Sequence, residues 1–422
     1  MNLARKFVLR MLEGLQAGNL ELVCPRETYT YGDPGSPLRA VIAVHDERFF
    51  ARSLFSGDIG LGESYMAGEW SSPDLVAVVR LAVRNLSRLE QGNRLFSFIS
   101  RIANVVQHRL RKNSITGSRK NIHHHYDLGN EFYKLFLDPS LAYSCAYFLN
   151  EDDALEKAQT QKFERICRKL RLSPEDHLLE IGTGWGGFAA YAAARYGCRI
   201  TTTTISREQH EYAAALFSEL GLSNGSHPQV MLLFEDYRKL EGKYDKIVSI
   251  EMFEAVGLAN YDAYFAACDR LLQPHGTMLI QAINMNERTF PSYIRGCDWI
   301  QKYIFPGAEL ASLIEIQRSL NRCTTLSLYN AEDIGSHYAR TLKLWRAAFL
   351  DRVPEVRALG FDDVFIRMWD YYFAYCEGAF CERHIGDFQL FLTKKLHSAP
   401  LMDEPWNEDQ TIGRHGRMRL RE

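Results

Sequence analysis

The stretch Leu178-Leu179-Glu180-Ile181-Gly182-Thr183-Gly184-Trp185-Gly186-Gly187 decides the fold of this chain. It is an apolar strand that ends in Glu-x-Gly-x-Gly-x-Gly, a pattern with which nucleoside-binding α/β domains open. Glycine allows the backbone to approach a ligand where any Cβ would clash. Plain packing of a strand, a turn and a helix is the alternative interpretation.

The next predicted strand distinguishes between two kinds of nucleoside ligand. A dinucleotide site would carry G-x-G-x-x-G, place a pyrophosphate on the helix N-terminus and supply an acid about 20 residues later for the ribose. That later position here reads Thr201-Thr202-Thr203-Thr204-Ile205-Ser206. Together with the acid before the glycines, this favours S-adenosylmethionine over a dinucleotide.

Alternation of strands and helices follows the glycine run and predicts an α/β fold. A parallel sheet with helices on both faces is expected from such an order. Together with the preference for S-adenosylmethionine, it favours a Rossmann-like class I methyltransferase domain over residues 119–396. Its predicted strands are 177–181, 199–204, 230–234, 246–250, 278–283, 324–328 and 387–393, with an aromatic-rich helical insertion at 290–322 and later helices at 331–350 and 362–380. Ligands bind beyond the carboxyl ends of such strands, where Glu180, Thr204, Asp236, Glu251 and Gln281 fall.

A second, smaller domain is expected before this one. The chain has 422 residues and 46% hydrophobic content, enough for two cores. Residues 1–118 mix a short helix, a strand at 38–44 and two helices, which predicts a mixed α+β domain. Its association with lipid or membrane is expected from the basic segment described below. Residues 397–422 read as a polar tail.

Charge and cysteine usage narrow the compartment and the partners. The net charge of −2 argues against a globally basic nucleic-acid binder. The cysteines include no C-x-x-C pair, which argues against disulfides and structural zinc and favours a reducing cytosol. Arg5, Lys6 and Arg10 interrupt the first apolar segment, so no signal peptide is expected, and no uncharged stretch is long enough to span a membrane.

One segment is strongly basic. Between Arg94 and Lys120 the chain carries several Lys and Arg residues and no acid, while apolar residues recur at helical spacing. This pattern predicts an amphipathic helix on an anionic membrane surface, and hence a cytoplasmic protein peripherally bound to the inner face of the membrane. The alternative is a solvated helix that packs on its own domain.

Four further motifs suggest a family. They are His-His-Tyr-Asp-Leu-Gly-Asn-Glu-Phe-Tyr (124–133), Leu-Ala-Tyr-Ser-Cys-Ala-Tyr-Phe (141–148), Val-Ser-Ile-Glu-Met-Phe-Glu-Ala-Val-Gly (248–257) and Lys-Tyr-Ile-Phe-Pro-Gly (302–307). With them the chain closely resembles the cyclopropane fatty acid synthase family, including its mycolic-acid and plant relatives. The resemblance covers residues 121–394 and extends more loosely to 57–70.

The resemblance implies an activity and a cofactor site. S-adenosylmethionine would donate a methylene to the cis double bond of an acyl chain, often within a membrane phospholipid. The resemblance also suggests a homodimer. The residues implied around the cofactor are Tyr143, Ser144, Leu179, Glu180, Gly182, Gly184, Trp185, Gly186, Thr204, Ile205, Ser206, Gln209, Tyr237 and Arg238.

The resemblance also implies a bicarbonate ion as the base. Its expected partners are the backbones of Cys145 and Ile283 and the side chains of Glu254 and Tyr338. Gln281 stands where the family's best-known members have histidine, and Gln donates hydrogen bonds but carries no proton. This change leaves open whether the product is a ring or a chain with a methyl or methylene branch.

Cys376 occupies the position of a cysteine long suspected of catalysis in the family, and a packed core cysteine is the alternative interpretation. No metal site is predicted, because the adjacent residues His123 to His125 cannot all face one ion.

The chemistry sets physical demands that these residues could meet. An alkene is a weak nucleophile, so the reaction depends on alignment with the methyl donor, and positive charge then develops on carbon. An aromatic, water-free channel with an anion nearby stabilises such a cation. The insertion's aromatics Phe290, Tyr293, Trp299, Tyr303 and Phe305 are expected to line or cover that channel, unless they only pack a lid. Methylation of a polar acceptor and non-catalytic lipid binding are competing hypotheses.

Overall fold

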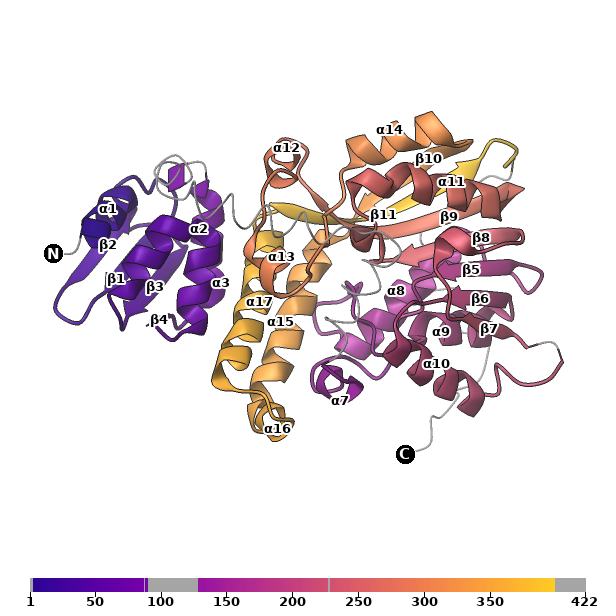
Figure 1. Ribbon diagram of the computed structural model, residues 1–422, viewed down its shortest axis with the longest axis horizontal. Coiled ribbons are helices and arrows are strands. Elements are labelled where there is room, and N and C mark those ends of the chain that lie inside the picture. The colour runs from indigo at the N-terminus through magenta and orange to yellow at the C-terminus, as the bar shows by residue number, and fades with distance from the viewer. Residues whose placement is uncertain (1–2, 87, 90–127, 227, 399–422) are drawn as a thin grey trace.

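The computed structural model describes residues 3–86, 88–89, 128–226 and 228–398 (Figure 1). The basic segment 94–120, the triple histidine and all but the first two residues of the predicted tail 397–422 lie outside these ranges. Among the described residues, no helix combines the length and apolar character needed to cross a bilayer.

A seven-stranded, mainly parallel sheet forms the larger domain, as expected. Its strand order is β10-β11-β9-β8-β5-β6-β7. The parallel strands are β5 (His177–Ile181), β6 (Arg199–Thr203), β7 (Val230–Leu233), β8 (Tyr244–Ile250) and β9 (Leu272–Met285). The antiparallel strands are β10 (Leu326–Asp333) and β11 (Ile385–Lys394), and β11 pairs with β9.

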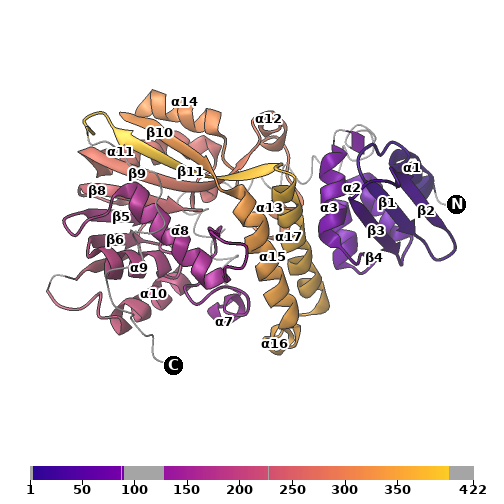
Figure 2. The ribbon, with the colours of Figure 1, turned by 180° about the vertical axis from the view of Figure 1, so that it is seen from behind.

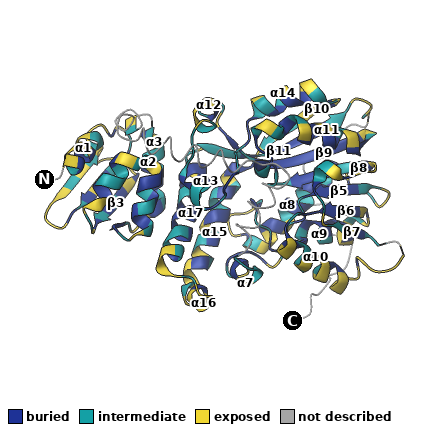
Figure 3. Ribbon diagram, viewed as in Figure 1, coloured by how far each residue is buried: buried dark blue, intermediate teal, exposed yellow. Residues whose placement is uncertain are grey.

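Helices cover both faces of this sheet because neighbouring strand residues point to opposite sides. Leu178 packs with α8 (Leu155–Leu170), α9 (Gly187–Tyr196) and α10 (Arg207–Glu219). Leu179 packs in the other core, with α11 (Tyr261–Leu271) and α14 (Leu313–Cys323). The view from behind shows α8 in front of the sheet, and the central strands are buried (Figures 2 and 3).

The edge strand β10 is longer than predicted. It runs to Asp333, so α15 (Gly335–Asp351) begins four residues after the predicted start at 331. Most β10 residues are exposed or half-buried at the sheet edge. The sequence did not predict the full strand, because these residues are largely polar and form no continuous apolar run.

The smaller domain contains α1 (Leu3–Leu12), α2 (Arg48–Met66), α3 (Leu75–Arg84) and a four-stranded sheet. The sheet order is β2 (Thr28–Gly32), β1 (Asn19–Val23), β3 (Arg39–Val44) and β4 (Trp70–Ser71). The sequence predicted only β3, since the polar and aromatic strand β2 gives no apolar pattern. The mixed α+β character agrees with the prediction.

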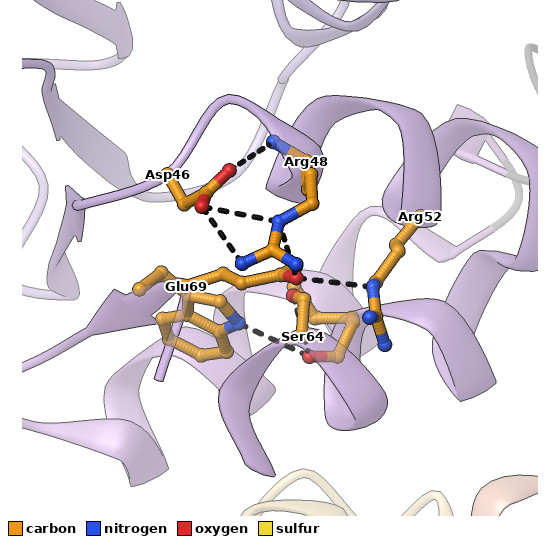
Figure 4. A network of polar contacts seen from close by, with 7 residues as sticks. Asp46, Arg48, Arg52, Ser64 and Glu69 are labelled. Carbon is orange, nitrogen blue, oxygen red and sulfur yellow. Dashed lines mark hydrogen bonds and ion pairs between the residues drawn. The ribbon is translucent and has the colours of Figure 1, made fainter. Parts of the chain in front are cut away.

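A buried acid fixes α2 against β4 in this domain (Figure 4). Glu69 is 1% exposed and pairs with Arg52 at 3.2 Å and with Arg48 at 3.5 Å. The neighbouring Trp70 donates from Nε1 to the Leu61 carbonyl at 3.1 Å. Both contacts tie the short strand to the helix.

Helices α15 and α17 (Asp363–Cys381) stand between the sheet and the smaller domain, with α16 (Val353–Ala358) joining them (Figure 1). The smaller domain packs closely on α17: a Cβ on Gly378 would lie 2.7 Å from Val79 Cγ1. Tyr65 donates to Asp370 Oδ2 across the same contact at 2.6 Å. One apolar core therefore extends from the smaller domain to α17.

The predicted helical insertion forms three helices. They are α12 (Phe290–Tyr293), α13 (Trp299–Tyr303) and α14. A Cβ on Gly62 would lie 2.4 Å from the Trp299 ring, so α13 rests directly on α2.

Candidate functional site

A cavity of about 1210 Å³ opens at the carboxyl ends of the parallel strands. It begins at the glycine loop after β5 and extends between α17 and the insertion into the smaller domain. The position is the one expected for a ligand site in such a sheet.

The glycine loop provides room for a ligand beside the backbone. Gly182 and Gly184 have φ of +102° and +53°, and a Cβ on Gly184 would meet no atom within 4 Å. Gly187 is needed for close packing, since a Cβ added at this position would lie 2.5 Å from the Ser140 carbonyl oxygen. The loop thus combines close packing behind with an open face toward the cavity.

Polar side chains surround this open face. Thr202 donates to Glu180 Oε2 at 2.5 Å, and burial raises the pKa of Glu180 to about 8. Thr204 donates to Gln209 Oε1 at 3.0 Å, which places a hydroxyl and an amide together at the end of β6. These groups can bind the hydroxyls and amino-acid part of S-adenosylmethionine, and the open glycine turn fits its close approach.

Most of the predicted cofactor residues line this one cavity. They are Tyr143, Ser144, Glu180, Gly182, Gly184, Trp185, Thr204, Ile205, Gln209, Tyr237 and Arg238.

Three predicted cofactor residues do not line the cavity. Leu179 packs in the core, Gly186 lies against the Phe217 ring, and Ser206 caps α10 by accepting from the Gln209 backbone. Their direct contact with a cofactor stays a prediction.

Ser144 is held by buried polar contacts. Lys162 Nζ donates to the Ser144 hydroxyl at 2.6 Å, and Gln159 donates to the Ser144 carbonyl at 2.9 Å. Both donors come from α8, and Lys162 is fully buried. Burial lowers the pKa of Lys162, while nearby carboxylates, Glu251 first, raise it.

A carboxylate that the sequence placed at the carboxyl end of a strand, without giving it a role, stands at the centre of the site. Glu251, directly after β8, accepts from the Cys145 backbone N–H and from Gln281 Nε2, each at 2.7 Å. Tyr338 donates to its other oxygen at 2.6 Å. Glu251 faces the same cavity as the glycine loop.

These contacts change the arrangement expected around bicarbonate. Two of its predicted partners, the Cys145 N–H and the Tyr338 hydroxyl, bind Glu251. A third, the Ile283 N–H, donates to Glu254 Oε1 at 2.5 Å. Bicarbonate itself stays a prediction.

Gln281 has a defined orientation between two carboxyl groups. Its Nε2 donates to Glu251 and also to Asp387 Oδ2 at 3.0 Å, and its Oε1 accepts from Gln389 at 3.1 Å. Because Oε1 is engaged by a donor, the amide NH₂ must face the acids. Gln281 lies behind Glu251 and does not line the cavity.

Burial makes the neighbouring carboxyl groups poor acids. Burial and then the nearby Glu251 raise the pKa of Glu254 to about 8, and the same two causes raise the pKa of Asp387 well above its usual range. Burial also raises the pKa of Glu251, and hydrogen bonds from Tyr338 and the Cys145 backbone offset part of that rise. Of the three acids, Glu251 has the strongest support for a negative charge.

Aromatic side chains of α17 form one wall of the cavity, called the aromatic wall below. Tyr371, Tyr372, Tyr375 and Phe380 come from α17 or its end, and they were not selected from the sequence.

The insertion contributes less to this lining than expected. Tyr293 and Phe305 line the cavity, whereas Phe290, Trp299 and Tyr303 do not. Trp299 is fully buried, and Tyr303 donates to Glu63 at 2.6 Å, so these two hold the domains together.

The two candidate cysteines have protonated thiols. Cys376 lines the cavity, and burial raises the pKa of its thiol far above neutral. Burial likewise raises the pKa of the Cys145 thiol, and this residue takes part through its backbone. A thiol nucleophile would need a lowered pKa. In the part of the chain that the structure describes, no group of three His, Cys, Asp or Glu is placed to hold a metal.

Comparison with known proteins identifies similar chains. The family model described as mycolic acid cyclopropane synthetase matches residues 113–390. The tuberculostearic acid methyltransferase UfaA1 of Mycobacterium tuberculosis is 37% identical over 86% of this chain and 84% of its own. The cyclopropane-fatty-acyl-phospholipid synthase of Escherichia coli K12 is 37% identical over 85% of this chain and 89% of its own.

A solved structure agrees with the fold and the cofactor. Mycolic acid cyclopropane synthase CmaA1 complexed with SAH and CTAB superposes with a TM-score of 0.59 and is 30% identical, covering 65% of this chain and 98% of that one.

Proposed function

Since this chain belongs to the mycolic acid cyclopropane synthetase family and is an S-adenosylmethionine-dependent methyltransferase, we propose that it adds a methylene to the cis double bond of unsaturated acyl chains in phospholipids. The product of this reaction is a cyclopropane ring. Transfer of a methyl or methylene branch without ring closure is the alternative, because the two relatives of equal identity are named for different activities.

The observation that carries the proposal is the continuity of the cavity. One space joins the glycine loop, the carboxyl groups and the aromatic wall to an apolar chamber in the smaller domain. Leu15, Leu20, Leu22, Ile42 and Leu81 are buried residues that line this chamber. A long hydrocarbon chain fits such a space, whereas a small polar acceptor would leave most of it unused.

The site also meets the chemical demands of the reaction. The bound cofactor supplies an electrophilic methyl group, and the chain must hold the double bond in line with it. The faces of Tyr371, Tyr372 and Tyr375 can stabilise positive charge on carbon, each by about 0.5 to 2 kcal/mol. The reaction also requires a proton acceptor beside the added methyl, and the resemblance suggests bicarbonate for that role.

The proposal includes action at a membrane surface. Acyl chains of phospholipids are reached from the bilayer, and the basic sequence from Arg94 to Lys120 suits an anionic surface. A cytoplasmic protein bound peripherally to the inner face of the membrane would follow. Sedimentation with anionic and neutral vesicles tests this part: equal binding to both would contradict it.

The central test follows a methyl label. Purified protein is mixed with methyl-labelled S-adenosylmethionine and vesicles of unsaturated phospholipid, and label is measured in the acyl chains. We expect products heavier by one methylene that no longer take up hydrogen, as a ring has consumed the alkene. A product that still takes up hydrogen would favour the methylene branch, and no incorporation by folded protein would contradict the proposal.

A further inference from the structure

We propose that Glu251 is the proton acceptor of this reaction and that its carboxylate takes the place of a recruited bicarbonate ion. The inference rests on the proposed function and assigns its base.

The hydrogen-bond donors around Glu251 form a preorganised site for a negative charge. A backbone N–H, a carboxamide and a phenol converge on the two oxygens over 2.6 to 2.7 Å. These donors come from three distant parts of the chain, Cys145, Gln281 and Tyr338. Such convergence of donors stabilises a negative charge in a buried site.

A free anion would compete for these same donors. Bicarbonate needs hydrogen-bond donors, and the Cys145 and Tyr338 donors predicted for it are engaged by Glu251. Adding a second anion beside Glu251 would also place like charges in contact in a buried space, which is costly. The Glu251 carboxylate therefore has an advantage over bicarbonate as the base. It is attached to the chain, so its presence in the site does not depend on the bicarbonate concentration in solution.

The backbone of Glu251 supports a functional role. Its φ of +47° lies in the left-handed region, which is uncommon for a residue with a Cβ. Strained conformations of this kind persist where the surrounding structure holds them, and they gather at active sites. A glycine would be unstrained here, but it would lack the carboxylate.

The neighbouring acids are less suited to accept the proton. Glu254 receives one hydrogen bond, from Ile283, and its Oε2 has no partner among the described residues. Asp387 is buried behind Gln281 and does not line the cavity. Glu251 combines access to the cavity with three hydrogen-bond donors that favour its ionised form.

Ring closure transfers one proton to Glu251. The alkene carbon bonds to the methyl carbon as the methyl–sulfur bond breaks, and the electron pair of that bond stays on sulfur. A C–H bond of the added methyl then breaks, and its proton passes to a Glu251 oxygen. The electron pair of that bond closes the ring and neutralises the carbon cation. Glu251 releases the proton to water when products leave.

The test compares Glu251→Gly with Glu251→Gln in buffer freed of carbon dioxide. The glycine relieves the positive φ and empties the anion site, whereas glutamine fills it without a charge. We expect ¹³C-bicarbonate, followed by NMR line broadening, to bind saturably to Glu251→Gly but not to the wild type or to Glu251→Gln. S-adenosylmethionine affinity by calorimetry should be the same in all three.

Turnover provides the second readout. Wild-type turnover should not change when bicarbonate is added. Both variants should lose about 100-fold or more, and bicarbonate should restore at least part of the loss in Glu251→Gly alone. Wild-type turnover that requires bicarbonate, or a Glu251→Gln variant with full activity, would overturn the inference.

The two proposals can fail separately. Absence of wild-type turnover on every unsaturated lipid would remove the proposed function, whereas the bicarbonate-binding comparison needs no turnover and still tests the anion site. If Glu251→Gly does not fold, Glu251→Gln and the bicarbonate dependence of the wild type decide the question.

Discussion

Tyr338 donates its hydroxyl hydrogen to Glu251 Oε2 over 2.6 Å while its ring stacks on Phe380, with ring centroids 4.5 Å apart. The ring and the hydroxyl of this residue therefore have separate roles. The ring belongs to the aromatic wall, and the hydroxyl helps to keep a buried carboxylate ionised.

Replacing Tyr338 with Phe should remove the hydrogen bond to Glu251 and keep the ring contact with Phe380. A hydrogen bond to a charged group contributes about 1.5 to 3 kcal/mol, so we expect kcat to fall about 10- to 100-fold with unchanged affinity for S-adenosylmethionine. Steady-state kinetics and calorimetry measure the two effects. Tyr329→Phe is the matched control, because Tyr329 is 53% exposed on β10. A variant with normal kcat would mean that Tyr338 only packs.

The glycine loop offers a test of the cofactor site. Gly184→Ala should weaken S-adenosylmethionine binding about 10-fold or more, since the new Cβ would enter the open space that faces the cavity. Gly360→Ala is the control: Gly360 also has a positive φ, +95°, and open space around it, but lies in the turn before α17. Equal affinity in both variants would place the cofactor elsewhere.

Gly187→Ala should instead lower the stability of the folded protein, because the added Cβ would lie 2.5 Å from the Ser140 carbonyl oxygen.

The sequence predicted the sheet and the cofactor loop because both depend on local patterns. An apolar strand followed by glycines specifies strand, turn and helix within a few residues, and β5, β6, β8 and β9 lie where the alternation placed them. Strand β2 and most of β10 were missed, because their exposed or half-buried residues show no apolar pattern.

The role of Glu251 could not be predicted in the same way. The sequence placed it at the carboxyl end of a strand, as it did Gln281 on the neighbouring strand. That Cys145 and Tyr338 donate to it follows only from the fold, since 106 and 87 residues separate them from Glu251. The aromatic face of α17 was missed for a similar reason: aromatic residues occur all around this helix, so the pattern does not reveal which side faces the cavity.

Stability should depend on pH through Glu254. Its pKa rises to about 8 in the folded protein, above the value of about 4.3 for an unfolded chain. The folded state therefore binds more protons between these values, and stability falls as pH rises through this window, by up to about 1.4 kcal/mol per pH unit for one group.

Glu254→Gln should flatten this dependence. Urea unfolding at pH 6 and pH 8 measures the change in free energy, which should be smaller in the variant than in the wild type. Glu208→Gln, at an exposed position on α10, is the control. Identical pH dependence in wild type and Glu254→Gln would show that Glu254 does not titrate as the burial indicates.

The apolar chamber of the smaller domain can be tested by filling it. Met11 lies on α1 and lines the cavity, whereas Leu3 on the same helix is 68% exposed. Met11→Trp should lower kcat/KM for long-chain unsaturated phospholipid about 10-fold, because the larger side chain occupies space that we assign to hydrocarbon, and it should leave S-adenosylmethionine affinity unchanged. Leu3→Trp adds the same side chain outside the cavity and should have little effect. Normal kcat/KM in Met11→Trp, with the fold intact by thermal unfolding, would show that acyl chains do not reach the smaller domain.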